Sequence, residues 1–349
     1  MTAADPRTVT REQEIGSPRW PNPHFVLLGA GASKAALPNG DKNGMDLPLM
    51  RNIAVELKLA DAFPDDLQEL ADTDFEAAFS RLYERDPSRA ASFEEAIADY
   101  FERLRLPDEA NLYDALLLSL RSKDAIFTFN WDPLLFISRV RLNQRGLGDH
   151  LPSIFYLHGN VIAAYCETDD VFGYTNGICS QCGKPFTKTR LLFPVTKKDY
   201  NTDPGIRAAW EAAHEVLRQT FMLTVFGYSA PVTDVEAFDL LQQGWGTVSE
   251  RNMEETEIIH RPDADADELD ELIERWQPFI HSHHYELHDS FYDSWLGMHP
   301  RRTAEAHRNQ YYEAKFIESN PIPRDLSNLD DLVAWFEPLL HAEQQAAVR

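Results

Sequence analysis

Polar side chains that could take part in chemistry follow two short apolar segments of the chain. Asn130 and Asp132 come at the end of residues 125–129, and His158 comes directly after residues 153–157. An amide can hold a hydroxyl or a water, a carboxylate can orient it, and an imidazole that titrates near neutral pH can act as a general base. The simpler alternative is an Asx turn with a helix cap for Asn130 and Asp132, and a buried histidine with satisfied hydrogen bonds for His158.

A glycine turn follows the apolar segment at residues 24–28. It consists of Gly29, Ala30, Gly31, Ala32 and Ser33. Glycines at the start of a helix let a pyrophosphate approach the backbone N–H groups without meeting a Cβ atom. Ser33 could donate its hydroxyl to a phosphate or cap the helix. Because Lys34 stands where the dinucleotide fingerprint has its third glycine, a tight structural turn is the alternative.

Two segments carry residue types that bind metals. Cys179 and Cys182 form a C-x-x-C knuckle, whose loop shape suits thiolate ligands of zinc. A histidine-rich segment near the C-terminus contains His281, His283, His284, Glu286 and His288. On a strand the last three would share one face, which is enough for a metal site in principle. Without a matching motif, a solvated or interfacial strand is the simpler interpretation.

The apolar segments that precede these residues have the pattern of buried parallel strands, and helical periodicity lies between them. Strands are predicted at residues 24–28, 125–129, 153–157, 191–195, 221–226, 256–260 and 284–288. Helices are predicted at residues 47–59, 206–219 and 265–276, and in pieces over 72–120. We therefore predict an α/β fold: a Rossmann-like doubly wound parallel sheet with a helical insertion and a small cysteine-containing module. Such sheets bind ligands at the carboxyl ends of their strands.

The domain organisation follows from these elements. The length suggests two domains at first, but the strand pattern favours one enlarged domain over residues 24–349 behind a flexible N-terminal arm at 1–23. Within that domain we expect a helical insertion at 72–120, a cysteine module at 161–190 and a C-terminal extension at 244–349. The extension is expected to supply the last strands of the same sheet, because the Rossmann order needs strands after residues 221–226.

Composition excludes several classes of protein. The 349 residues include 57 Asp and Glu against 33 Lys and Arg, a formal net charge of −24. Such an excess repels phosphate backbones and anionic lipid surfaces, which argues against direct binding of nucleic acid or membranes. No apolar run reaches the length of a membrane span. Three cysteines and the absence of a signal pattern point to a reducing cytoplasm.

The order of the motifs resembles the sirtuin-like superfamily over about residues 24–240. The glycine turn with its serine comes first, then Asn130-Trp131-Asp132, then Leu157-His158-Gly159, then the cysteines, and then Gly227-Tyr228-Ser229. Within the superfamily, the segment from Phe226 to Asp234 and the acidic, diverged chain look more like bacterial defence effectors than protein deacylases. Those effectors consume NAD⁺ during phage infection.

The resemblance implies roles for the matching positions. Asn130 and His158 would be catalytic, and Asp132 would position the nicotinamide ribose. The glycine turn would hold the pyrophosphate of NAD⁺, while Gly227 and Ser229 would close around the adenosine side. The sirtuin loop Gly-Ile-Pro-Asp-Phe-Arg is only faintly echoed here by Leu37-Pro38 and residues 39–44, so the nicotinamide contacts depart from the family pattern.

The resemblance also implies a zinc site. Sirtuins use two knuckles after His-Gly, and here Cys166 and Asp169 would form the first, with Asp169 in place of the fourth cysteine. The zinc would then be held by Cys166, Asp169, Cys179 and Cys182, or by the three thiolates and a water. A decayed module without metal is the alternative.

The resulting hypothesis is an NAD⁺ glycohydrolase that releases nicotinamide and ADP-ribose and depletes NAD⁺ in anti-phage defence. Unrestrained hydrolysis would be toxic to the host, so we expect gating by homo-oligomerisation, by a partner ATPase or nuclease, or by an infection trigger. Two alternatives are a deacylase that transfers a lysine acyl group to NAD⁺, and a non-catalytic module that senses NAD⁺ or ADP-ribose.

Overall fold

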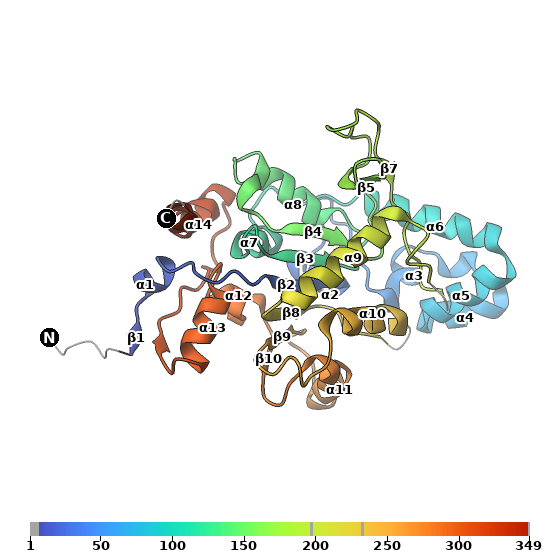
Figure 1. Cartoon of the computed structure of the whole chain (residues 1–349). Coiled ribbons are helices and arrows are strands. Elements are labelled where there is room, and N and C mark those ends of the chain that lie inside the picture. The colour runs from blue at the N-terminus through green and yellow to red at the C-terminus, as the bar shows by residue number, and fades with distance from the viewer. Residues whose placement is uncertain (1–6, 196–197, 232–233, 348–349) are drawn as a thin grey trace.

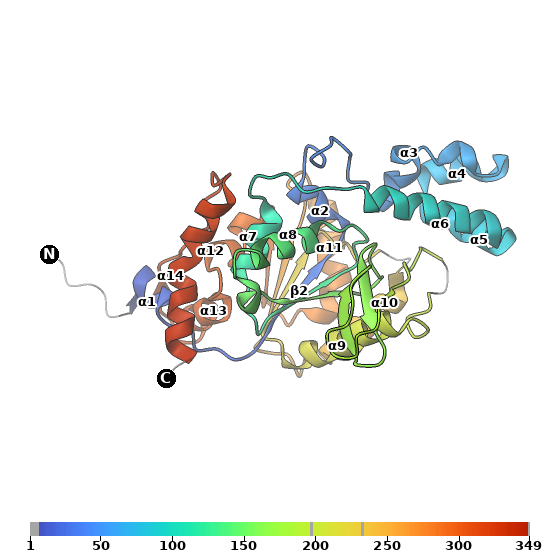
Figure 2. The same ribbon diagram turned by 90° about the horizontal axis from the view of Figure 1, so that it is seen from above.

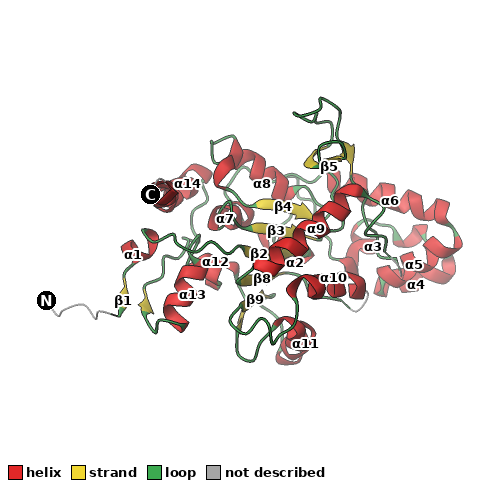
Figure 3. Cartoon of the chain, in the orientation of Figure 1, coloured by secondary structure: helices red, strands yellow, loops and turns green. Residues whose placement is uncertain are grey.

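The core of the fold is a six-stranded parallel sheet (Figures 1 and 3). The structure is a computed structural model, and it describes residues 7–195, 198–231 and 234–347. Its order is β10-β9-β8-β2-β3-β4. The strands are β2 (His24–Leu28), β3 (Ala125–Thr128), β4 (Ser153–Tyr156), β8 (Met222–Phe226), β9 (Glu255–Ile259) and β10 (Tyr285–His288). This is the strand order of doubly wound sheets, and it confirms the predicted fold class. The strand order reverses between β2 and β8.

The strands β2, β3 and β8 are buried on both faces, which explains their largely apolar sequences. The strand β9 is equally buried but carries Glu255 and Glu257. Along β2, Phe25 and Leu27 join one core while Val26 and Leu28 join the other, because successive side chains point to opposite faces. Helices that contribute to the first core are α9 (Pro204–Gln219), α10 (Val235–Trp245) and α11 (Ala266–Trp276). Helices that contribute to the second are α2 (Ala30–Ala36), α7 (Leu112–Ser119), α8 (Leu134–Asn143) and α14 (Leu329–Ala347).

A helical segment lies between β2 and β3, as the periodicity predicted. It consists of α3 (Ile53–Glu56), α4 (Asp65–Thr73), α5 (Phe75–Arg85), α6 (Pro87–Glu102) and then α7. The segment therefore begins before residue 72, whereas the helix predicted over 47–59 is reduced to α3 and short 3₁₀ turns. Figure 2 shows that α4, α5 and α6 extend beyond the end of the sheet instead of lying over it. The helix α7 returns to the sheet and ends at Ser119, shortly before β3 begins at Ala125.

The cysteine module contains strands that its polar sequence did not reveal. Three short strands form an antiparallel sheet in the order β6-β5-β7: β5 (Ala163–Cys166), β6 (Val171–Tyr174) and β7 (Thr187–Lys188). The strand predicted at residues 191–195 was wrong, because this segment passes the end of β4 without joining a ladder. Its backbone is held there by the N–H of Leu192, which donates to the carbonyl of His158 at 2.9 Å.

The two ends of the described chain pack together. The C-terminal part supplies β9 and β10 to the main sheet, as expected, and continues through α12 (Trp295–Met298), α13 (Thr303–Tyr311), β11 (Phe316–Ile317) and α14. The N-terminal residues differ from the expected loose arm, because β1 (Thr8–Val9) pairs with β11 and α1 (Arg11–Ile15) follows with a capping box. Among the described residues, no helix has both the length and the apolar character that crossing a bilayer requires.

Candidate active site

The glycine turn and the loop after β8 cross in direct contact at the point where the strand order reverses. The N–H of Gly31 donates to the carbonyl of Gly227 at 3.0 Å. A Cβ atom on Gly29 would lie 2.5 Å from that carbonyl oxygen, and one on Gly31 would lie 2.8 Å from the Gly227 Cα. Gly227 itself has a φ of +67°, which favours glycine. The three glycines are therefore needed for the crossing itself, whatever binds beside it.

The remaining residues of the turn and loop have different surroundings. Ala30, the first residue of α2, is exposed, whereas Ala32 is buried and its N–H donates to the carbonyl of Gly29 at 3.0 Å. Ser229 is exposed and its carbonyl accepts from the Arg275 guanidinium at 3.3 Å. The accessible part of the predicted pyrophosphate site is thus the beginning of α2 at Ala30.

Ser33, Tyr113, Asn130 and Asp132 form a buried network that we call the Asn130 cluster. The Ser33 hydroxyl donates to Asp132 Oδ2 at 2.7 Å and lies 2.6 Å from the Tyr113 hydroxyl. It also accepts from Asn130 Nδ2 at 3.0 Å. With one proton and two lone pairs, this hydroxyl is fully used inside the protein. Ser33 therefore positions Asn130 and Asp132, and would have to release one of them to reach a phosphate.

The orientation of the Asn130 amide follows from its neighbours. Its Nδ2 lies 3.0 Å from the carbonyl of Gly29, which can only accept, so the NH₂ group must face it. The amide oxygen is then the atom that can receive a hydrogen bond from a hydroxyl or a water. The loop is fixed from behind by Asn160, whose Nδ2 donates to the backbone carbonyls of Asn130 at 3.1 Å and Asp132 at 2.6 Å.

Asp132 both forms an Asx turn and holds a hydroxyl group, so the structural and the chemical interpretations of this residue are compatible. Its Oδ1 accepts from the N–H of Leu134 at 3.0 Å, which forms the Asx turn of the structural alternative and leads into α8, whose N-cap position is Pro133. Its Oδ2 holds Ser33. Burial raises the pKa of Asp132, and the two hydrogen bonds oppose that rise.

His158 lies in a second buried group, the His158 cluster, formed with Lys198, Tyr200, Tyr228 and Asp234. Its Nε2 is 3.3 Å from the Tyr200 hydroxyl and 3.8 Å from Asp234 Oδ1. Asp234 also accepts from Lys198 Nζ at 2.5 Å and from the Tyr228 hydroxyl at 2.8 Å. Burial lowers the pKa of His158 to about 4, against the attraction of Asp234 and together with the repulsion of Lys198. The imidazole is therefore neutral at pH 7 and available as a proton acceptor.

The glycine after His158 has a steric reason. Gly159 has a φ of +73°, and a Cβ atom there would lie 1.8 Å from the carbonyl oxygen of Arg190. The chain needs this turn to pass from the end of β4 into the cysteine module. The Phe129 ring packs on the imidazole with centroids 4.5 Å apart, and among the described side chains His158 and Asn130 share no hydrogen bond.

A cavity of about 290 Å³ opens beside the His158 cluster. Lys198, Tyr200 and Asp234 line one part of it, and Glu76 of α5 and Glu236 of α10 are among the residues that line the rest. The N–H of Lys198 donates to Glu236 Oε2 at 3.1 Å, so the segment at Lys198 is tied to the start of α10. Through Glu76 of α5, the helical segment between β2 and β3 contributes to the cavity beside His158.

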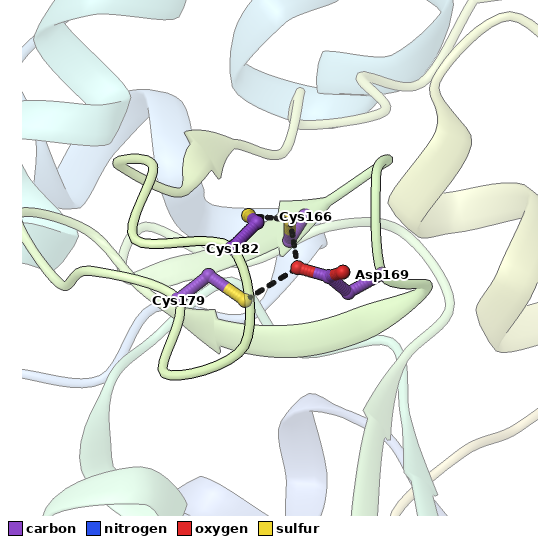
Figure 4. A group of neighbouring side chains, drawn as sticks. All are labelled: Cys166, Asp169, Cys179 and Cys182. Atoms are coloured by element: carbon purple, nitrogen blue, oxygen red, sulfur yellow. Dashed lines mark hydrogen bonds between the residues drawn. The ribbon is translucent and has the colours of Figure 1, made fainter.

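The cysteine module brings its four predicted ligands together (Figure 4). The ligand atoms of Cys166, Asp169, Cys179 and Cys182 all lie within 4.8 Å of one another. Asp169 Oδ2 is 3.0 Å from the Cys179 sulfur and 3.5 Å from the Cys166 sulfur, which is 3.5 Å from the Cys182 sulfur. Zn–S bonds of about 2.3 Å in a tetrahedron separate their ligands by roughly 3.8 Å. The donor set and its spacing therefore fit zinc.

The histidine-rich segment does not form a comparable group. His288 Nε2 lies 3.4 Å from Glu257 and 3.3 Å from Glu286, and His284 Nδ1 lies 3.9 Å from Glu255. These side chains pair with acids of β9 and β10 instead of converging. The cysteine group is the one metal-capable cluster among the described residues.

Sequence reasoning missed several residues of both clusters. Tyr113 and Asn160 carry no motif, because one stands in an apolar helix and the other follows His-Gly without special spacing. Lys198 and Tyr200 come from a segment expected to follow a strand. Asp234 is the last residue of the segment from Phe226 to Asp234 that supported the resemblance. Its carboxylate is the one feature of these missed residues that the sequence could have indicated.

Comparisons with known proteins give weak similarity. No family model matches the chain, and no curated protein matches it. A Sir2 homologue in complex with NAD is 13% identical, with 84% of this chain and 93% of that chain covered and a TM-score of 0.41. A mutant Sir2 homologue in complex with ADP-ribose is 14% identical, with 97% of each chain covered and a TM-score of 0.40. A sirtuin structure described as showing the structural basis of sirtuin substrate affinity is 15% identical, with 81% of this chain and 93% of that chain covered and a TM-score of 0.39. The fold class rests on the strand order and the helical layers.

Proposed function

We propose that this protein is an NAD⁺ glycohydrolase of sirtuin-like type, which cleaves the bond between nicotinamide and ribose. One observation carries the proposal. A neutral, buried imidazole and an oriented Asn–Asp pair stand at the carboxyl ends of the adjacent strands β4 and β3. They lie on the edge of a doubly wound sheet where ligands bind, next to the reversal of strand order.

The chemistry suits these groups. Nicotinamide leaves readily because its ring nitrogen is cationic, so an enzyme mainly stabilises an oxocarbenium-like centre and delivers a water. The Asn130 amide oxygen would accept a hydrogen bond from that water or from a ribose hydroxyl. The Asp132 carboxylate would hold the nicotinamide ribose from the Ser33 side. His158 would take the proton of the attacking water, and Asp234 would stabilise the imidazolium that results.

Binding of NAD⁺ to so acidic a chain needs aimed donors instead of long-range attraction. We infer that the pyrophosphate approaches the beginning of α2 at Ala30, where the glycine crossing keeps side chains away. Ser229 and the Gly227 turn would close on the adenosine side. The four ligands of the cysteine module would hold a structural zinc that fixes β5 and the knuckle, and this zinc would take no part in the reaction.

The biological role we propose is depletion of NAD⁺ in bacterial anti-phage defence, in the cytoplasm. Gating would come from a homo-oligomer, from a partner ATPase or nuclease, or from an infection trigger. The net charge of −24 disfavours direct recognition of phage nucleic acid by this chain, and we infer that a partner or another ligand has that role.

The test is nicotinamide release from NAD⁺ by the full chain. Asn130→Ala and His158→Ala are each expected to reduce turnover by about 10²-fold or more. His283→Ala, a histidine that is exposed and outside both clusters, is the matched control and is expected to leave turnover unchanged. Turnover that requires an acyl-lysine peptide would favour the deacylase instead. Tight binding of NAD⁺ without any turnover would favour the sensing module.

A further inference from the structure

A second and larger cavity lies between the cysteine module and the body of the protein. Its volume is about 690 Å³, within the range of small-molecule sites. It is formed by the end of α6, the start of α8, the chain that leaves His-Gly, and the module itself. Both views in Figures 1 and 2 place the module beside these helices. No residue of the Asn130 or His158 cluster lines this cleft, so it is separate from the candidate active site.

Arg105 gives the cleft an uncompensated positive charge. Its guanidinium Nη1 donates to the carbonyls of Glu102 at 2.7 Å and Leu104 at 2.8 Å, and within the described chain it forms no ion pair with a carboxylate. The acid at the same rim, Glu102, is already paired with Lys188 across the cleft. The Arg105 side chain belongs to an exposed residue, and its remaining N–H groups can form the paired hydrogen bonds that suit phosphates and carboxylates.

The rest of the lining is largely apolar. Ile137 of α8, Ile162 and Phe186 contribute hydrophobic surface, and Asn176 adds an amide. The ring of Phe186 lies against the backbone of the module, because a Cβ atom on Gly173 would be 2.4 Å from it. The wall is also held firmly, since the N–H of Thr175 donates to the Ile162 carbonyl at 2.9 Å. A fixed aromatic face and two isoleucines suit a flat ring.

We propose that this cleft binds a small anion that carries a ring, with its phosphate or carboxylate on Arg105 and its ring against Ile137, Ile162 and Phe186. The inference does not depend on the proposed NAD⁺ hydrolysis. It assigns the cleft to a ligand that is smaller than NAD⁺ and binds at a different place on the protein.

The test uses phenyl phosphate as the probe and titration calorimetry on the full chain. Phenyl phosphate is expected to bind, and phenol and inorganic phosphate, which each lack one half of the ligand, are expected to bind at least tenfold more weakly. Arg105→Gln is expected to weaken binding of phenyl phosphate by about tenfold or more, because a charge-assisted hydrogen bond is lost. Arg103→Gln removes the same charge from an exposed arginine outside the cleft and is expected to change nothing.

A second variant tests whether the anion lies in the cleft beside Ile137. Ile137→Glu places a negative charge in the cleft from a partly exposed position and is expected to abolish binding. Failure of phenyl phosphate to bind, or equal affinity for the wild type and Arg105→Gln, would overturn the proposal. Displacement of the probe by ADP-ribose would place it in the active site instead. Displacement by an acetyl-lysine peptide would assign the cleft to the deacylase alternative, and that result also rejects the proposal.

Discussion

Replacing Ser33 tests the hydrogen-bond network of the Asn130 cluster most severely. Ser33→Ala removes the bonds to Asp132, Tyr113 and Asn130 at once. Asn130 Nδ2 keeps the carbonyl of Gly29, but the carboxylate loses a donor and the Tyr113 hydroxyl loses its close partner. Each buried polar group left unsatisfied costs about 1–3 kcal/mol, so we expect the free energy of unfolding to fall by about 3–5 kcal/mol.

Tyr113→Phe is expected to be much milder in the wild-type background. It removes the 2.6 Å bond to Ser33 while the serine keeps its donor to Asp132 and its acceptor bond from Asn130. The expected loss is about 1 kcal/mol. In the Ser33→Ala background the Tyr113 hydroxyl has already lost its acceptor and keeps a long hydrogen bond of 3.4 Å from Asn130 Nδ2, so the same change should cost little or restore stability. The two substitutions should therefore couple by about 1–2 kcal/mol.

Urea unfolding, followed by fluorescence and by circular dichroism, gives the free energy of unfolding of the wild type, the two single variants and the double variant. Coincident transitions by the two methods test two-state behaviour. Ser119→Ala is the matched control, because within the described residues this buried hydroxyl bonds only the helical carbonyl of Leu116, and the change should cost less than about 1 kcal/mol. Additive effects of Ser33→Ala and Tyr113→Phe, or a loss for Ser33→Ala no larger than the control, would refute the network.

Three further predictions concern charge and metal. Lys198→Gln should raise the pKa of His158 from about 4, because the lysine's positive charge disfavours the imidazolium; an unchanged NMR titration would contradict this. Burial also lowers the pKa of His24 to about 4, so the unfolded chain takes up this proton first as the pH falls below about 6.5. The free energy of unfolding should therefore fall by about 3 kcal/mol as the pH decreases from 6.5 to 4. His24→Gln should make the free energy of unfolding depend less steeply on pH in this range. Protein purified without chelator should contain about one zinc per chain, and Cys179→Ala should remove it; metal-free wild type would reject the zinc site.

The sequence predicted the sheet and its polar edge because both depend on local patterns. An uninterrupted apolar segment followed at once by Asn130-Trp131-Asp132 or His158-Gly159 marks the end of a buried strand, and the structure has both at such ends. The two late strands were likewise found where the Rossmann order required them. Their order in the sheet was inferred from the fold class, since pairing between distant strands leaves no local signal.

The contacts that complete each cluster could not be predicted in the same way. Tyr113 meets Ser33 across 80 residues of chain, and its helix has the composition of ordinary core. Lys198 reaches Asp234 across 36 residues, and each charge taken alone is typical of a loop. The strands of the cysteine module were missed because all three are short and because β6 and β7, unlike the buried β5, are at least partly exposed. The N-terminal arm is held by the pairing of β1 with β11. This pairing could not be predicted, because β11 lies more than 300 residues away and the arm itself carries no signal for it.

The most direct test of the account is a single-turnover experiment with the protein in excess over NAD⁺, so that even a slow, gated enzyme yields product. Proton NMR follows the nicotinamide and ADP-ribose signals over time. The account predicts equal amounts of both products from the wild type, without any acyl-lysine peptide, and loss of both in His158→Ala. NAD⁺ that stays intact in the presence of the excess wild type would contradict it.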